Sequence, residues 1–127
     1  MAEILIVDDS KVMREMIIAC LRPLAEARFT HAASGLEAIE KMSLQKFDLM
    51  VLDLNMPDIG GLEVLEFVRG QDKLRLLPIV VVTTRGDEGS QTKATKAGAT
   101  RFMTKPFDPT IILSEVSALL ANPARAA

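Results

Sequence analysis

Three short apolar runs, rich in branched side chains and bounded by turn-forming residues, place the tightest constraint on how this chain can fold. They are Ile4–Val7, Leu49–Leu52 and Ile79–Val82. Runs of this length and composition are typical of β-strands that are buried on both faces, as in the parallel sheets of α/β proteins. Weaker strand candidates lie at Phe29–Ala32 and Arg101–Thr104. The sequence therefore predicts five strands, three of them buried on both faces.

The segments between these runs carry the spacing and the capping signals of α-helices. Over residues 12–24, apolar side chains recur at the 3.6-residue period of one buried helix face. Ser34, followed three residues later by Glu37, is a capping-box signal for a second helix, and Asp108-Pro109 marks the start of the last one. The residues expected on the buried face of the first helix are Val12, Met13, Met16, Ile17, Cys20, Leu21 and Leu24.

Two further helices are expected near Gly61–Arg69 and Asp87–Ala97. The second of these has scarcely any apolar face beyond Ala94 and Ala97, so we expect it to be loosely anchored. Strands and helices then alternate along the chain, which predicts a parallel sheet with right-handed crossovers and helices on both faces. A chain of 127 residues suits one such domain and is too short for two. We therefore expect a single domain over residues 1–127, with a short tail at 122–127.

Charge and cysteine content argue against several classes of function. The net charge is −2, which favours neither nucleic acid nor an acidic membrane as a partner. The single cysteine, Cys20, cannot form a disulfide framework or a metal site by itself, and we expect it to be a buried bystander. No apolar run reaches the roughly 18 residues that span a bilayer, and a strand-like segment stands where a secretory leader would begin. We expect a cytoplasmic protein without membrane insertion.

Polar residues whose side chains can bind a ligand or take part in a reaction follow four of the five predicted strands. In an open α/β sheet, ligands bind outside the carboxyl ends of the strands, where the loops converge. Each residue alone has an ordinary structural role, such as capping a helix or ending a strand, but their coincidence on four strand ends points to one site. The residues are Asp8 and Asp9 after the first strand, Asp53 after the third, Thr83 and Thr84 at the fourth, and Lys105 after the fifth.

Three carboxylates on one rim indicate a divalent cation. Each close pair repels by about 4 kcal/mol at the effective dielectric of a protein surface, and a bound cation removes that cost. Mg²⁺ prefers a few carboxylate oxygens, retained waters and a phosphate oxygen, which fits two or three of these acids with an incoming phosphoryl group. Zinc is disfavoured, because His31 is the only histidine and is placed on the second strand.

A carboxylate can also act as a nucleophile toward phosphorus and form an aspartyl phosphate. That reaction needs cationic and hydrogen-bonding groups that neutralise the phosphoryl oxygens, and Lys105 and the Thr83 hydroxyl are of suitable types. Neither the G-x-x-x-x-G-K-[ST] loop nor a G-x-G-x-x-G motif is present, so no nucleotide is evidently held. The phosphoryl donor is expected to be another protein or a small phosphate ester.

These motifs resemble the receiver domain of two-component response regulators, most closely its single-domain chemotaxis (CheY-like) members. The resemblance extends from Ile4 to Leu120. It rests on the acid pair in Val7-Asp8-Asp9-Ser10, the acceptor loop Leu52-Asp53-Leu54-Asn55-Met56-Pro57, the hydroxyl of Thr83, the aromatic ring of Phe102, Lys105-Pro106, whose proline is cis in the family, and Met13-Arg14.

The resemblance implies a fold, and it implies a role for each matched residue. The fold is a flavodoxin-like (βα)5 doubly wound sheet of five parallel strands in the order 2-1-3-4-5. Asp53 would be the phosphoacceptor, with Lys105 as the active-site lysine and Thr83 and Phe102 as the switch pair. The implied Mg²⁺ ligands are Asp9 directly, Asp8 largely through water, Asp53, and the backbone carbonyl of Asn55.

The resemblance also implies a signalling role. A histidine kinase or a phosphotransfer protein would supply the phosphoryl group, and the domain would catalyse only its own phosphorylation and slow dephosphorylation. The signal would reach a non-covalently bound effector through the face formed by the fourth helix, fifth strand and fifth helix. Phe102 replaces the commoner tyrosine, Thr84 stands where many members have alanine, and Asn55 and Arg85 occupy positions that tune the lifetime of the phosphoryl group.

Two other readings of the same residues make different predictions. Haloacid-dehalogenase-like phosphatases use an aspartyl nucleophile at the end of the first strand with a second acid two residues later, whereas Asp53 ends the third strand and is followed by Asn55. A phosphatase would turn over many equivalents of a phosphate ester. A degenerate receiver, used only for protein interaction, would lack the acid pair, the acceptor or the lysine, and would not bind metal or a phosphoryl analogue.

Overall fold

The computed structural model describes residues 1–121, and the tail expected at 122–127 lies outside the described residues. The strands are β1 (Ala2–Val7), β2 (Ala27–Ala32), β3 (Leu49–Leu52), β4 (Ile79–Thr83) and β5 (Arg101–Thr104). The helices are α1 (Lys11–Leu21), α2 (Gly35–Leu44), α3 (Gly61–Gly70), α4 (Glu88–Ala97) and α5 (Pro109–Ala121). All the predicted strands are confirmed, including the two weaker candidates.

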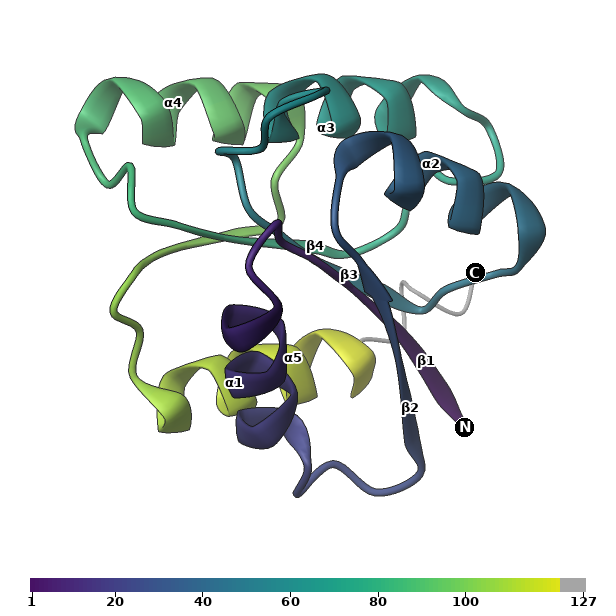
Figure 1. The fold of residues 1–127 in the computed structure, drawn as a ribbon. Helices are drawn as coiled ribbons and strands as arrows, with labels where there is room; N and C mark the ends of the chain where they lie inside the picture. The colour runs from purple at the N-terminus through teal and green to yellow at the C-terminus, as the bar shows by residue number, and fades with distance from the viewer. Residues whose placement is uncertain (122–127) are drawn as a thin grey trace.

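The strands form one parallel sheet in the order β2-β1-β3-β4-β5, which confirms the implied flavodoxin-like topology. Helices α1 and α5 cover one face of the sheet, and α2, α3 and α4 cover the other (Figure 1). In the sheet register, Val7 at the end of β1 lies beside Leu52 at the end of β3. The residues that follow these two central strands therefore emerge next to each other.

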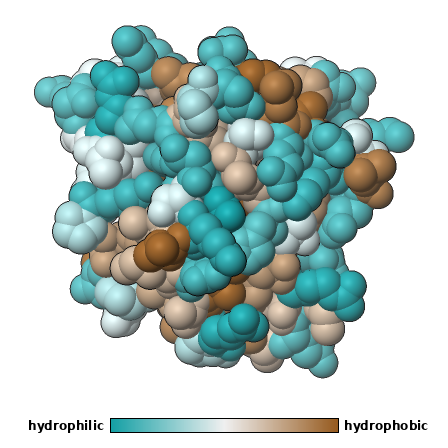
Figure 2. Space-filling model, in the orientation of Figure 1, coloured by the Kyte–Doolittle hydropathy of each residue, from teal (hydrophilic) through white to brown (hydrophobic). Residues whose placement is uncertain are grey.

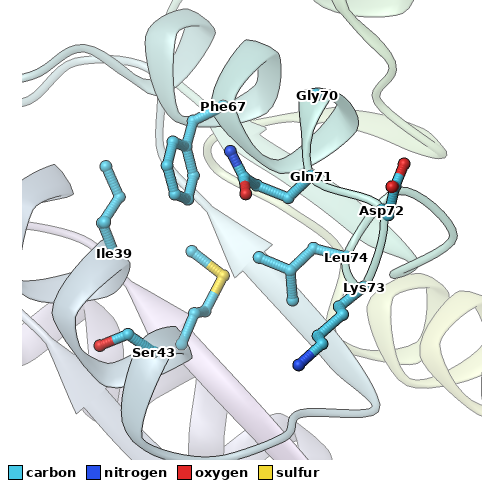
Figure 3. Close-up of a pocket in the computed structure, with 9 residues that line it drawn as sticks. Ile39, Ser43, Phe67, Gly70, Gln71, Asp72, Lys73 and Leu74 are labelled. Carbon is cyan, nitrogen blue, oxygen red and sulfur yellow. The ribbon is translucent and has the colours of Figure 1, made fainter.

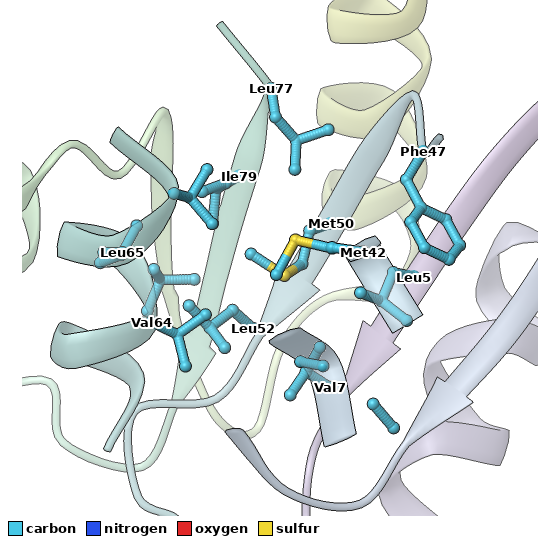
Figure 4. Packing of buried hydrophobic residues seen from close by; sticks show 14 of the residues in the cluster. Leu5, Val7, Met42, Phe47, Met50, Leu52, Val64, Leu65, Leu77 and Ile79 are labelled. Atoms are coloured by element: carbon cyan, nitrogen blue, oxygen red, sulfur yellow. The ribbon is translucent and has the colours of Figure 1, made fainter. Parts of the chain in front are cut away.

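Alternation along the strands builds two separate cores. Leu5 and Val7 pack in the cluster under α2, α3 and α4, whereas Ile4 and Ile6 pack in the cluster under α1 and α5. The first of these clusters is the one seen at close range in Figure 4. Because successive side chains of a strand point to opposite faces, a continuous apolar run fills both layers. This is the physical reason why β1, β3 and β4 lack the polar alternation of an exposed strand.

The predicted helix starts are confirmed by their capping bonds. The Ser34 hydroxyl accepts a hydrogen bond from the Glu37 amide at 3.1 Å, and the Asp108 carboxylate accepts one from the Thr110 amide at 2.8 Å. Helix α4 begins after Asp87 and has Ala94 as its only buried residue, in agreement with its predicted lack of an apolar face. Its loose anchoring stays a prediction.

The buried face predicted for α1 is partly wrong. Val12 is 67% exposed and Met16 is 50% exposed, whereas Arg14 is buried and so is Ile18. The helix therefore turns a different stripe toward the sheet, because the Arg14 guanidinium finds buried hydrogen-bond acceptors and can occupy a position that hydropathy assigns to an apolar residue. Cys20 is half-buried rather than buried, and that burial raises the pKa of its thiol.

The exposed surface mixes polar and apolar residues. Figure 2 shows a largely hydrophilic face in which hydrophobic side chains form separate spots. Scattered exposed apolar residues of this kind are ordinary in folded proteins. Among residues 1–121, no helix has both the length and the apolar composition needed to cross a membrane.

Candidate functional site

Three carboxylates meet at the carboxyl edge of the sheet. Asp8 and Asp9 directly follow β1, and Asp53 follows β3, its neighbour in the sheet. The Asp53 amide donates to the Val7 carbonyl at 3.0 Å, which continues the strand ladder into the loop. One carboxylate oxygen from each acid can be chosen so that all three lie within 4.8 Å of one another. The predicted convergence of these acids is confirmed.

The first turn of helix α3 packs against the loop that contains Asp53. The Gly61 amide donates to the Leu54 carbonyl at 3.1 Å, so the first turn of the helix packs directly on the loop backbone. A Cβ on Gly61 would lie 2.5 Å from the Asp53 carbonyl oxygen, which leaves no room for any side chain. Glycine at this position therefore allows a close approach that fixes Asp53 relative to the sheet.

Lys105 reaches the acids from the loop after β5. Its ammonium lies 2.7 Å from an Asp8 carboxylate oxygen and 3.6 Å from an Asp53 carboxylate oxygen. Its backbone amide donates to the Thr83 carbonyl at 2.8 Å, and the peptide bond to Pro106 is cis, as the resemblance implied. All three side chains are largely buried, so their charges interact in a medium that screens them less than water does.

The environment of Asp53 disfavours its negative charge. Burial raises the pKa of the Asp53 carboxyl, and the neighbouring Asp8 and Asp9 carboxylates raise it further. The Lys105 ammonium and the backbone amide of Asn55 oppose the rise in pKa without cancelling it. This backbone amide donates to the Asp53 carboxylate at 3.3 Å. An ionised Asp53 is therefore held at a free-energy cost that a cation bound among the acids would offset.

Asp53→Asn is expected to stabilise the metal-free fold. Because the folded-state pKa of Asp53 lies above its ordinary value, its favourable contribution exists at low pH and is lost as the pH rises through the folded-state pKa. The variant carries no charge at position 53. Its urea midpoint should therefore exceed that of the parent by an amount that grows as the pH rises through the folded-state pKa of Asp53. Circular dichroism over a pH series measures this. A variant less stable than the parent at neutral pH would contradict it.

The donor set fits a hard divalent cation. The cluster offers carboxylate oxygens only, without histidine or cysteine among its three members. Asp8 and Asp53 are buried while Asp9 is exposed, so the cluster opens toward solvent on one side. Mg²⁺ prefers oxygen ligands and retains bound water, whereas zinc sites in proteins are built mainly from cysteine and histidine. The residues present therefore fit Mg²⁺.

The side chain of Asn55 makes contacts that the sequence did not predict. Its amide nitrogen lies 3.4 Å from the Thr83 hydroxyl and 3.3 Å from the Thr84 hydroxyl, and donates to both. The Thr83 oxygen also accepts from the Arg85 amide at 3.2 Å and is fully buried. Asn55 thus links the acceptor loop to the end of β4. Sequence reasoning had considered only its backbone carbonyl and its position in the loop.

Phe102 lies away from the acids. It is a half-buried residue of β5 that packs against the core under α2, α3 and α4, and its partner in the sheet register is Val81. Thr83, two residues further along β4, pairs with Thr104 instead. The structure therefore brings together Asp8, Asp9, Asp53, Asn55, Thr83 and Lys105. Phe102 lies on β5, which β4 separates from β3 and the Asp53 loop.

Arg14 is a buried site neighbour for which sequence analysis gave no function. One guanidinium nitrogen donates to the Asp8 backbone carbonyl at 2.5 Å, and another donates to the Nδ1 atom of His31 at 3.0 Å. The available signal was an arginine that directly follows Met13 within the apolar-periodic stretch of the first helix.

A cavity of about 590 Å³ lies elsewhere, between α2 and α3 (Figure 3). Ile39, Met42, Phe67 and Leu74 give it an apolar wall, and Lys73 and Asp72 lie at its edge. None of its lining residues belongs to the acid cluster. The chemistry of the strand ends is therefore separate from this cavity.

Comparisons with known proteins agree with this geometry. Residues 4–117 match the family described as response regulator receiver domain. Chemotaxis protein CheY1 of Helicobacter pylori is 32% identical over 121 residues, which cover 94% of this chain and 98% of the relative. The structure of chemotaxis response regulator CheY4 of Vibrio cholerae superposes with a TM-score of 0.85 at 34% identity, covering 94% of this chain and 98% of the other.

A further solved structure is described as a BeF3-activated DrrB receiver domain. It superposes with a TM-score of 0.86 at 28% identity and covers 96% of this chain and 99% of that chain. The family match spans nearly the whole chain, and the fold and the acid cluster are those that the sequence resemblance implied. This chain belongs to the response regulator receiver domain family, whose members are phosphorylation-activated switches in two-component signalling.

Proposed function

We propose that this chain, as one receiver domain over residues 1–127, accepts a phosphoryl group on Asp53 and uses it as a conformational signal. Asp8, Asp9, Asp53 and the backbone carbonyl of Asn55 would hold Mg²⁺. The observation that carries the proposal is the buried Asp53 carboxylate, clustered with two further acids and 3.6 Å from the Lys105 ammonium. A purely structural ion pair would not need the third acid.

The transfer makes and breaks one bond to phosphorus. An Asp53 carboxylate oxygen forms the new O–P bond while the bond from phosphorus to the donor group breaks, and the donor keeps that electron pair. Bound Mg²⁺ supplies positive charge that offsets the charge of the phosphoryl oxygens. The Lys105 ammonium and the Thr83 hydroxyl act on those oxygens as hydrogen-bond donors. Hydrolysis by water later returns the carboxylate and inorganic phosphate.

Membership of the family supports a proposal for the partners. A histidine kinase or a phosphotransfer protein supplies the phosphoryl group, and an effector protein binds non-covalently in the cytoplasm. The chain catalyses only its own phosphorylation and slow dephosphorylation. Neither nucleic acid nor a membrane is proposed as a direct partner, since the net charge of −2 provides no general attraction to them.

The output surface is proposed to be the face formed by α4, β5 and α5. Thr83 would move toward the phosphoryl oxygens and give up its bond from Asn55, and the Phe102 ring would enter the space that becomes free. Helix α4 suits this role because Ala94 is its only buried residue, and we therefore expect it to be easily displaced. Effector binding then follows a shift between two packings of this region.

Phosphorylation should depend on Mg²⁺. After incubation with acetyl phosphate, intact-mass measurement is expected to show one added phosphoryl group in the presence of Mg²⁺ and none in the presence of a chelator, because the cation offsets the repulsion among the acids. Release of inorganic phosphate should remain slow, in contrast to the multiple turnovers of a phosphatase. Equal labelling with and without chelator would overturn the metal assignment.

A further inference from the structure

Arg14 is the one buried charged residue that the proposed chemistry leaves without a function. Four polar or charged residues are buried among residues 1–121, and the other three are Asp8, Asp53 and Thr83, all members of the site. Burying a guanidinium is costly unless its donors are satisfied in place. Its acceptors therefore indicate what the residue does.

The first acceptor is the peptide that joins the two metal-ligand candidates. An Arg14 guanidinium nitrogen donates to the Asp8 backbone carbonyl at 2.5 Å, in a fully buried contact. That carbonyl belongs to the same peptide plane as the Asp9 amide, so holding it fixes the direction in which the backbone enters Asp9. Asp8 itself is anchored by three other bonds: its amide donates to the Ala32 carbonyl, and its carboxylate accepts from the Ser10 amide and from the Lys105 ammonium. Asp9 is exposed and lies between this peptide and Ser10, so the orientation of the peptide determines where the Asp9 backbone begins.

The second acceptor orients the guanidinium. The Arg14 Nε atom donates to Nδ1 of His31 on β2 at 3.0 Å. His31 can accept this bond only while Nδ1 carries no proton. Burial lowers the pKa of His31, and Arg14, Lys41 and Lys11 lower it further while Glu15 opposes them, so Nδ1 is available as an acceptor at neutral pH. Two elements, α1 and β2, thus determine the position of a donor that acts on the loop after β1.

We infer that Arg14, oriented by His31, is a positioning residue that fixes the Asp8–Asp9 peptide for Mg²⁺ binding. The inference rests on the proposed function, because it assigns Asp9 to the metal. Outer partners that orient metal ligands typically contribute a factor of about 10 to 100 in metal affinity. Arg14 acts here on the backbone rather than on a carboxylate, so it does not itself occupy a carboxylate oxygen that could bind the cation.

The sign of the effect separates positioning from simple electrostatics. Removing a cation near the acids should, by Coulomb's law alone, strengthen Mg²⁺ binding. The positioning role predicts the opposite, so Arg14→Met should weaken Mg²⁺ binding about tenfold. Arg28→Met is the matched control, since it removes the same charge from an exposed residue at the opposite end of the sheet and should leave the affinity unchanged.

The test is a Mg²⁺ titration of each folded variant, followed by the amide NMR signals of the acid loop. His31→Leu, which removes the acceptor, should weaken binding in the same direction as Arg14→Met, whereas His31→Asn keeps an acceptor and should bind like the parent. The two His31 variants test the inference even if Arg14→Met fails to fold. Amide exchange at Asp9 without metal should be faster in Arg14→Met or His31→Leu than in the parent.

The outcomes separate the inference from the function on which it rests. A parent that binds no Mg²⁺ would overturn the proposed function and with it the role of Arg14. A parent that binds Mg²⁺ would uphold the metal site. Unchanged or tighter binding in Arg14→Met, or in His31→Leu if the arginine variant does not fold, would then overturn the positioning role alone.

Discussion

Asp53→Asn is expected to abolish the phosphoryl adduct that forms with acetyl phosphate and Mg²⁺. An amide oxygen carries no full negative charge and is not a competent nucleophile toward phosphorus here, so the adduct should be lost completely. The variant should fold, because its only change removes a disfavoured buried charge. Intact-mass spectrometry of parent and variant after the same incubation gives the comparison.

A matched control variant tests whether this loss is specific to Asp53. Asp58→Asn makes the same chemical change in the loop between β3 and α3, at a carboxylate that accepts hydrogen bonds from the amides of Gly35 and Leu36. It should retain the adduct. An undiminished adduct on Asp53→Asn would move the acceptor to another residue, and loss of the adduct from both variants would indicate a general disturbance of the loop.

Lys105→Ala is expected to uncouple phosphorylation from the signal. The ammonium pairs with Asp8 and Asp53 in the resting site, and we propose that it pairs with the phosphoryl oxygens afterwards. Without it, Asp53 should still be labelled in excess Mg²⁺, but hydrogen exchange over residues 84–107 should lose the change that labelling causes in the parent. Helix α1 should change little in either protein.

The fold of the lysine variant must be checked separately. Removing one partner of a largely buried ion pair can cost about 3–5 kcal/mol, although Mg²⁺ can replace the lost positive charge in this cluster. Circular dichroism with Mg²⁺ present establishes whether the variant is folded. Lys105→Arg keeps the charge and is expected to retain part of the response. A labelled Lys105→Ala protein with the exchange pattern of the labelled parent would rule out the assigned role.

The sequence predicted the strand framework and most of the site because both follow from short-range patterns. A continuous apolar run has one favourable arrangement, a strand covered on both faces, and the residue after such a strand lies on the rim that carries ligands. Asp8, Asp53 and Lys105 met at that rim for this reason. The Ser34 cap was equally predictable, since the bond spans only three residues.

What the sequence did not predict depends on contacts between distant segments. Hydropathy placed Val12 and Met16 in the core, although both are exposed, because it cannot anticipate that Arg14 finds acceptors at Asp8 and His31. The bridge from Asn55 to β4 likewise joins residues that are far apart in the chain. In each case a polar side chain is satisfied by a partner whose position only the folded chain defines.

The most direct test of this account is to locate the phosphoryl group on the chain. Borohydride reduces an aspartyl phosphate to homoserine, so peptide mass spectrometry after labelling and reduction reads out the modified residue. We expect homoserine at position 53 in the Mg²⁺-treated parent, and its absence when a chelator is present. Reduction at Asp8, at Asp9 or at any other carboxylate, with position 53 unmodified, would contradict the claim that Asp53 is the phosphoacceptor.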